Sequence, residues 1–255
     1  MSHILCQTRR AETPWYIENA GLHIYSLEEL CYFICDNLAL LDEGILTEGL
    51  FRWLGRELGL SRLSHRLLQL QQKERTVAEL ILPILQETNY LSSGELRRLE
   101  QELNRMAGQP ASLRRKQRGD ALLLCKKYTR AIEAYRDALE EAGKVETSAA
   151  IYGGIYHNAG CAYSRLFQLD EAVECFRLAY ETLHSGKSLR NYLCAVYMKE
   201  GPTAFELLCH SLSVDEATEK EILAEMQGIE VPAMPEDPDA AIKAWTREYH
   251  RSTDM

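Results

Sequence analysis

Residues 127–142 read KYTRAIEAYRDALEEA, and residues 168–183 read QLDEAVECFRLAYETL, so one pattern occurs twice, 41 positions apart. Ala131 aligns with Ala172, and Tyr135 aligns with Phe176. Small and aromatic residues therefore keep the same phase in both copies. A repeat of this kind is typical of stacked helical units, each too small to bury its own apolar face.

The pattern extends backwards to a glycine in each copy. Gly119 lies twelve residues before Ala131, and Gly160 lies twelve residues before Ala172. Small residues at such positions let two helix axes approach closely, whereas a leucine would hold them apart. This order of small, bulky and aromatic positions resembles the tetratricopeptide repeat, in which each repeat is a pair of helices, A and B.

The resemblance covers about residues 112–212 and implies two to three repeats. The period of 41 is longer than the 34 residues of that family, and the additional residues fall at about 143–147. A weaker third copy aligns Asn191 with Asn158, but Leu193 replaces the glycine. We expect an all-α fold, a right-handed solenoid of helical hairpins with additional N-terminal helices.

The first 110 residues contain no copy of the repeat, but their apolar spacing predicts helices after about residue 25. Capping-box patterns mark two helix starts, at Ser26 with Glu29 and at Ser92 with Glu95. Pro83 should kink or split the helix that contains it. No alternating pattern is long enough to predict a sheet, although 14–17 fits a short extended segment. The predicted helices here include 43–58, 61–72 and 76–88.

Breaks in the pattern suggest three regions. We expect an unassigned helical region at 1–110, which ends at the glycine and proline of 108–110. A repeat array with a C-terminal capping helix should occupy 111–228, and that helix should begin at a capping box formed by Ser213 and Glu216. Residues 229–255 should form a proline-containing loop and a short terminal helix.

The overall charge argues against some partners. The chain has 38 acidic and 29 basic residues, a formal net charge of −9. This balance disfavours nonspecific attraction to nucleic acid or to anionic lipid, although a local basic patch could override it. The apolar runs are too short to span a bilayer, and the N-terminus has no secretory signal pattern. We therefore expect a cytoplasmic protein with no nucleic-acid or membrane partner, whose eight cysteines are reduced.

The resemblance implies a concave groove, lined by the A helices, that binds a peptide or a partner helix. Some members of the family hold a C-terminal carboxylate with Lys and Asn side chains from these helices. Lys116 and Asn158 match that motif, but Asp120 stands where an Asn belongs and would repel a carboxylate. Our candidate partner-binding residues are Lys116, Asp120, Tyr152, Tyr156, Asn158, Lys187, Arg190 and Asn191.

Each of these candidates also has a simpler interpretation. Lys187 and Arg190 are three residues apart, where the family motif has four, and could be ordinary solvated side chains. Tyr152 and Tyr156 belong to a tyrosine stripe that also fits partly buried packing. The adjacent Gly153 and Gly154 indicate either close backbone packing or a helix that starts after them. The Asn side chains remain the strongest candidates, because an amide can hydrogen-bond a peptide backbone.

Signals of catalysis are missing from the sequence. The chain has no phosphate-binding loop, no His-Glu-x-x-His and no Gly-x-Ser-x-Gly. Cys31 and Cys35 could supply two zinc ligands from one helix face, but no second pair of ligands stands near them. We expect no catalytic residues, no metal and no cofactor.

The sequence thus predicts a non-enzymatic adaptor or scaffold that binds a partner protein or peptide. The alternative is a structural protein that self-associates, for example as a homodimer, through an acidic, leucine-rich helical surface around Leu50–Leu70. In that stretch Phe51, Trp53 and Leu54 crowd together. A third alternative, a nucleic-acid regulator, would use the basic cluster at 114–118.

Overall fold

A computed structural model describes residues 9–41, 44–73, 75–88, 90–144, 148–229 and 235–252. The structure is 73% helical, and its helices pack as adjacent antiparallel pairs, which confirms the all-α helical-hairpin class. It divides into two compact units, Met1–Ala204 and Phe205–Met255. A break between helices does fall at 108–110, but the division into three regions stays a prediction.

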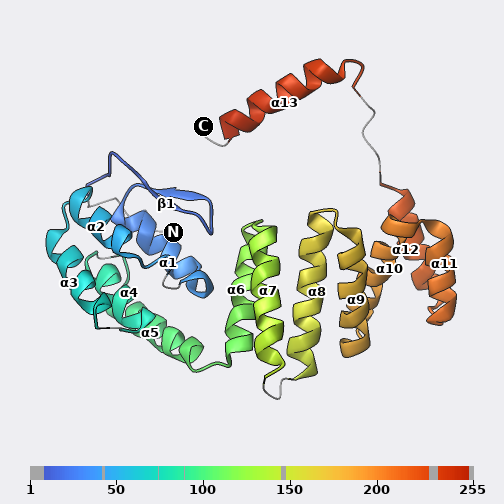
Figure 1. The fold of residues 1–255 in the computed structure, drawn as a ribbon, viewed down its shortest axis with the longest axis horizontal. Coiled ribbons are helices and arrows are strands. Elements are labelled where there is room, and N and C mark those ends of the chain that lie inside the picture. Colours follow the sequence, from blue (N-terminus) through green and yellow to red (C-terminus); the bar gives the residue numbers. More distant parts are fainter. Residues whose placement is uncertain are drawn as a thin grey trace. The chain divides into compact units, whose positions relative to one another are not determined.

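The first unit opens with a β-hairpin and continues as helices (Figure 1). Its N-terminal elements are β1 (Trp15–Ile17), β2 (Leu22–Ile24), α1 (Leu27–Asp36), the 3₁₀ helix η1 (Leu38–Leu40), α2 (Glu48–Arg56), α3 (Ser61–Gln71), α4 (Val77–Gln86) and α5 (Ser93–Ala107). The array that follows contains α6 (Ala111–Leu124), α7 (Tyr128–Ala142), α8 (Ala149–Arg165), α9 (Leu169–Leu183) and α10 (Gly186–Glu200). Then come α11 (Pro202–Ser211), α12 (Glu216–Gln227) and α13 (Pro238–Ser252).

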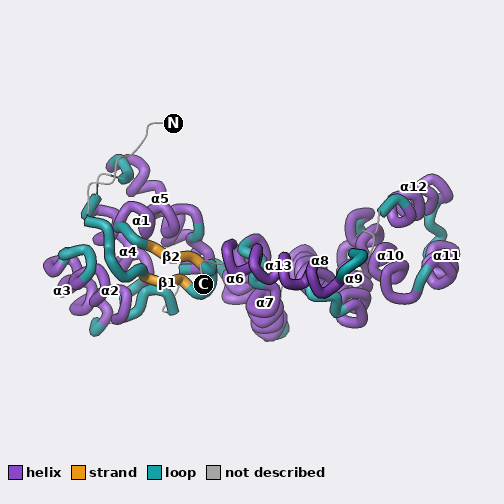
Figure 2. Tube along the Cα trace, turned by 90° about the horizontal axis from the view of Figure 1, so that it is seen from above, coloured by secondary structure: helices purple, strands orange, loops and turns teal. Residues whose placement is uncertain are grey.

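The hairpin corrects the expectation that no sheet forms. Strands β1 and β2 pair antiparallel, with Tyr16 opposite His23, and Figure 2 shows them in orange. The two rings lie 4.9 Å apart between centroids, a cross-strand contact that supports the pairing. Each strand is only three residues long, so alternation along it is too short to be recognised in sequence.

Helix starts follow the predicted chemistry in most places. Ser92 and Glu95 form a reciprocal capping box, and Ser26 accepts a bond from the backbone N–H of Glu29. Helix α4 continues through Pro83 instead of splitting there. The capping box predicted at Ser213 is wrong, because Asp215 caps α12 by accepting a hydrogen bond from the backbone N–H of Thr218.

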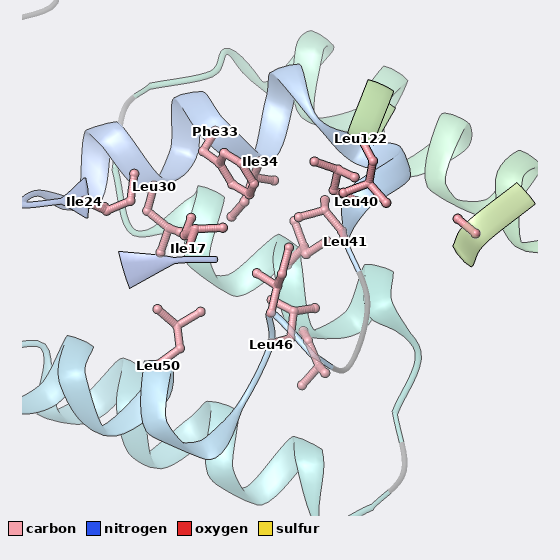
Figure 3. Close-up of a cluster of buried hydrophobic side chains, with 14 of the residues drawn as sticks. Ile17, Ile24, Leu30, Phe33, Ile34, Leu40, Leu41, Leu46, Leu50 and Leu122 are labelled. Carbon is pink, nitrogen blue, oxygen red and sulfur yellow. The ribbon is translucent and has the colours of Figure 1, made fainter. Parts of the chain in front are cut away.

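The N-terminal helices share one apolar core with the start of the array. Phe51, Trp53 and Leu54 are buried in this core, so they do not form the exposed surface that self-association through this stretch would need. Figure 3 shows Leu122 of α6 beside Leu40 of η1. Helix α6 is therefore fixed to the N-terminal helices by apolar packing.

The pairs α6–α7 and α8–α9 lie next to each other along the array (Figure 1), and the repeated residues make equivalent contacts in both. A Cβ added to Gly119 would lie within 3 Å of three ring carbons of Tyr135. One added to Gly160 would come within 2.8 Å of the ring of Phe176. The aromatic residue of each second helix thus lies on the glycine of the first, which explains why both positions recur in phase. Ala131, Ala138, Ala172 and Ala179 are fully buried in the same packing.

The two adjacent glycines of α8 lie inside the helix, which begins at Ala149. Gly153 is buried against Leu183 of α9, so close packing is the explanation that the structure supports. The turns between paired helices each contain a residue in the left-handed region, Lys126 with φ 59° and Phe167 with φ 58°.

In the second unit, α12 buries Ile222, whereas α13 exposes Ile242 and Trp245. In the described part of the chain, no helix is both long enough and apolar enough to cross a membrane.

Candidate functional site

The first helices of successive pairs, α6, α8 and α10, are linked by polar side chains. We call this set the A-helix strip. Its members are Lys116, Asp120, Gly154, His157, Asn158, Cys161 and Asn191. These residues are linked by hydrogen bonds and close contacts, so the structure brings together four of the predicted site residues: Lys116, Asp120, Asn158 and Asn191.

Asp120 is the centre of the strip. Its Oδ2 accepts a bond from Lys116 Nζ at 2.6 Å. Its Oδ1 accepts one from the hydroxyl of Tyr135 at 2.8 Å and one from Asn158 Nδ2 at 2.7 Å. Three donors, one of them charged, therefore compensate this carboxylate within the protein. Burial of Tyr135, together with the charge of Asp120, raises the pKa of that hydroxyl and keeps it protonated as a donor.

Lys116 forms an ion pair with the Asp120 carboxylate, and its side chain lies against Gly154 of α8. It lies one helical turn before Asp120 on α6, at the i, i+4 spacing that favours an ion pair. A Cβ on Gly154 would lie 3.1 Å from Lys116 Cε, so the absence of a side chain there leaves room for the lysine stem. The lysine charge is therefore already paired within the strip.

His157 connects α8 to α10. Asn191 Nδ2 lies 3.4 Å from its Nε2 and 4.0 Å from Cys161 Sγ. The imidazole is buried, and its Nδ1 bonds to no group among the described residues. Burial lowers the pKa of His157, and the charges of Lys187 and Lys116 lower it further, so the ring is neutral near pH 7.

The two asparagines keep their amide oxygens available. Each uses its Nδ2 within the protein, Asn158 toward Asp120 and Asn191 toward His157 and Cys161. No donor from the described residues bonds to either Oδ1. Because each side-chain nitrogen is engaged, one orientation of each amide is favoured, and each oxygen keeps its capacity to accept a hydrogen bond from a ligand.

Tyr152 and Tyr156 lie on another side of α8. Successive helical residues are rotated by about 100°, so Tyr156 points about 160° away from Asn158. Burial raises the pKa of Tyr156, and Cys175 and Tyr152 add to the shift. The structure therefore does not bring the two tyrosines to the A-helix strip.

The remaining candidates are on α10. Lys187 lies in its first turn, close enough to α8 for its charge to lower the pKa of His157. Arg190 is half-buried in the same helix. Sequence reasoning missed His157, Cys161 and Gly154, although the i, i+4 spacing of the first two could have placed them on one face beside Asn158.

The structure also shows how one arginine of the basic cluster is paired and in what state the described cysteines are. Arg115 pairs with Asp137 at 3.0 Å and with Glu141 at 3.5 Å. The seven described cysteines are free thiols, and burial raises the pKa of Cys31 to about 12. No group of three or more metal-ligating side chains is present in the described residues.

Antiparallel pairs in which an aromatic side chain packs on a glycine of the first helix, as in α6–α7 and α8–α9, are typical of helical-hairpin repeats. A family model described as the tetratricopeptide repeat matches residues 153–182, which correspond to most of α8 and α9. Residues 153–182 thus match one tetratricopeptide repeat, and the number of repeats in the chain stays a prediction. Comparisons with curated proteins and with solved structures found no match. Proteins of this family typically act in protein–protein interaction without catalysis.

Proposed function

We propose that this protein is a non-enzymatic, cytoplasmic adaptor that binds a partner protein through the A-helix strip, in a concave groove lined by α6, α8 and α10. The observation that carries the proposal is the pair of oriented amide oxygens on Asn158 and Asn191. These residues occupy matching positions in successive repeats of the sequence alignment. An extended peptide offers backbone N–H groups along its length, and two fixed acceptors can bind two of them.

The charge arrangement indicates how such a partner is recognised. Lys116 is paired with Asp120, and three internal donors already compensate that carboxylate. A free C-terminal carboxylate would therefore meet no unpaired lysine at this end of the strip. We propose that the ligand is an internal, extended segment recognised through its backbone, with Lys187 and Arg190 contacting it toward α10.

Affinity capture from lysate of the source cell tests this function. The strip variant is Asn158→Ala/Asn191→Ala, and the control variant is Gln101→Ala/Gln168→Ala, which removes two exposed amides elsewhere. Circular dichroism confirms that both variants are folded. A partner that binds the wild type and the control, but not the strip variant, supports the proposal. Equal capture by all three proteins contradicts it.

Self-association is the alternative function, and two exposed side chains favour it. Leu124 and Phe167, both beside turns between paired helices, are 84% and 78% exposed. Phe167 also has φ 58°, a conformation in which a bulky residue is unusual. Light scattering on the pure protein distinguishes the two functions, because a dimer that persists on dilution favours self-association.

A further inference from the structure

A large cavity lies in the first unit, outside the A-helix strip. It has a volume of about 940 Å³ and is bounded by η1, α4, α5, α6 and α7. No residue of the strip lines it. Sites that bind small organic molecules commonly have volumes of about 300–1,000 Å³. The cavity is therefore large enough for a ligand that is independent of the partner proposed above.

The charge of the cavity wall is opposite to that of the whole chain. Four arginines line it, against two acidic residues, Glu133 and Asp137. The complete sequence has 38 acidic and 29 basic residues. Guanidinium groups bind carboxylates and phosphates with well-defined, often bidentate geometry. The wall is thus complementary to an anion.

The arginines differ in how they are paired. Arg115 binds Asp137, and Arg130 binds Glu18 at 2.8 Å. Arg114 instead donates from Nη1 to the carbonyl oxygens of Ala107 at 2.9 Å and Gln109 at 2.7 Å. These acceptors are neutral, so they fix the guanidinium without cancelling its charge. Arg114 is therefore held in place with its Nη2 and Nε donors bonded to nothing else among the described residues.

The rest of the wall is mainly apolar. Leu38, Val77, Leu103 and Leu122 contribute from four different elements. An apolar chain placed against these side chains would be removed from water, which is favourable in proportion to the area buried. A ligand that satisfies both parts of the wall must have an apolar body and an anionic end.

We propose that this cavity binds an anionic amphiphile, with its apolar chain against the leucine-rich wall and its carboxylate or phosphate on Arg114. Carboxylates and phosphates share the chemistry that a guanidinium recognises, and the experiment below separates them. This site goes beyond the proposed peptide-binding function and does not depend on it.

Isothermal titration calorimetry of the full chain tests the site with three probes of equal chain length: decanoate, decyl phosphate and uncharged decanamide. At least one anion should bind at a single site. Arg114→Gln should weaken the binding of that anion roughly tenfold or more, because a hydrogen bond to a charged group is lost. The same variant should bind decanamide as tightly as the wild type does. The anion that binds more tightly identifies the natural head group as a carboxylate or a phosphate.

Two further variants complete the test. Arg97→Gln removes an exposed arginine of α5 that does not line the cavity, and it should bind all probes as the wild type does. Ala107→Trp places a bulky ring in the cavity but keeps the carbonyl partner of Arg114, and it should abolish binding even if Arg114→Gln fails to fold. The proposal is overturned if neither anion binds at millimolar concentration, if Ala107→Trp binds normally, or if a folded Arg114→Gln binds the anions unchanged.

Discussion

Alanine substitutions at the two adjacent glycines of α8 should have different effects on stability. Gly153 faces Leu183 of α9, whereas Gly154 faces the flexible end of Lys116. Because both positions lie in the interior of one helix, Gly→Ala raises the helix propensity of each by the same amount, about 1 kcal/mol. The two variants differ only in what the new methyl group meets.

The size of the difference follows from the packing. A Cβ on Gly153 would lie within 3 Å of three carbons of Leu183, a contact that real structures do not tolerate without movement. Such overpacking costs about 1–3 kcal/mol. A Cβ on Gly154 would lie 3.1 Å from Lys116 Cε, which can move away at little cost. Gly153→Ala should therefore be less stable than Gly154→Ala by about 1–3 kcal/mol.

Urea unfolding followed by circular dichroism measures this difference. Equal m-values would show that the two variants unfold between comparable states, so the midpoints can be compared directly. Each kcal/mol should correspond to about 2–4 °C in Tm for a unit of this size. Equal stabilities, or a more stable Gly153→Ala, would show that α8 and α9 do not pack as closely as the structure indicates.

Further substitutions test the strip, one turn and one thiol. Tyr135→Phe removes a donor from Asp120 and should destabilise the protein by about 1.5–3 kcal/mol, measured by urea unfolding. Phe167→Gly should raise stability by about 1 kcal/mol, because glycine tolerates the left-handed conformation; a drop in Tm would contradict this. The pKa of His157 lies below that of an unfolded chain, so the unfolded state binds the proton first. Stability should therefore be full above about pH 6.5 and fall as the pH drops through the folded pKa, and in His157→Gln the fall of Tm between pH 7.5 and 5.5 should be smaller. Cys31, with its pKa near 12, should have roughly 10³-fold less thiolate at pH 8 than an ordinary thiol, so iodoacetamide should label it only after unfolding.

The array was predictable because the contacts between its paired helices depend on the spacing of residues within a short stretch of sequence. The twelve-residue interval from Gly119 to Ala131, and the aromatic four residues later, are properties of two neighbouring helices. The hairpin at 15–24 was not predictable in this way, since its three-residue strands carry almost no periodic signal.

The role of Asp120 shows a different limit. From sequence it was expected to repel a ligand carboxylate, yet in the structure it accepts bonds from Lys116, Tyr135 and Asn158. Only the lysine, one turn earlier on the same helix, could have been anticipated. The tyrosine and the asparagine are 15 and 38 residues away in sequence, so their convergence depends on how three helices pack.

Photo-crosslinking in the source cell tests the central claim most directly, with p-benzoylphenylalanine in place of Lys187 or, as a control, of the exposed Tyr32 on α1. We predict a covalent adduct with a partner protein at position 187 that is absent at position 32 and is lost when Asn158→Ala/Asn191→Ala is added. An adduct with that partner at position 32 alone, or one at position 187 that survives the double substitution, would contradict binding through the A-helix strip.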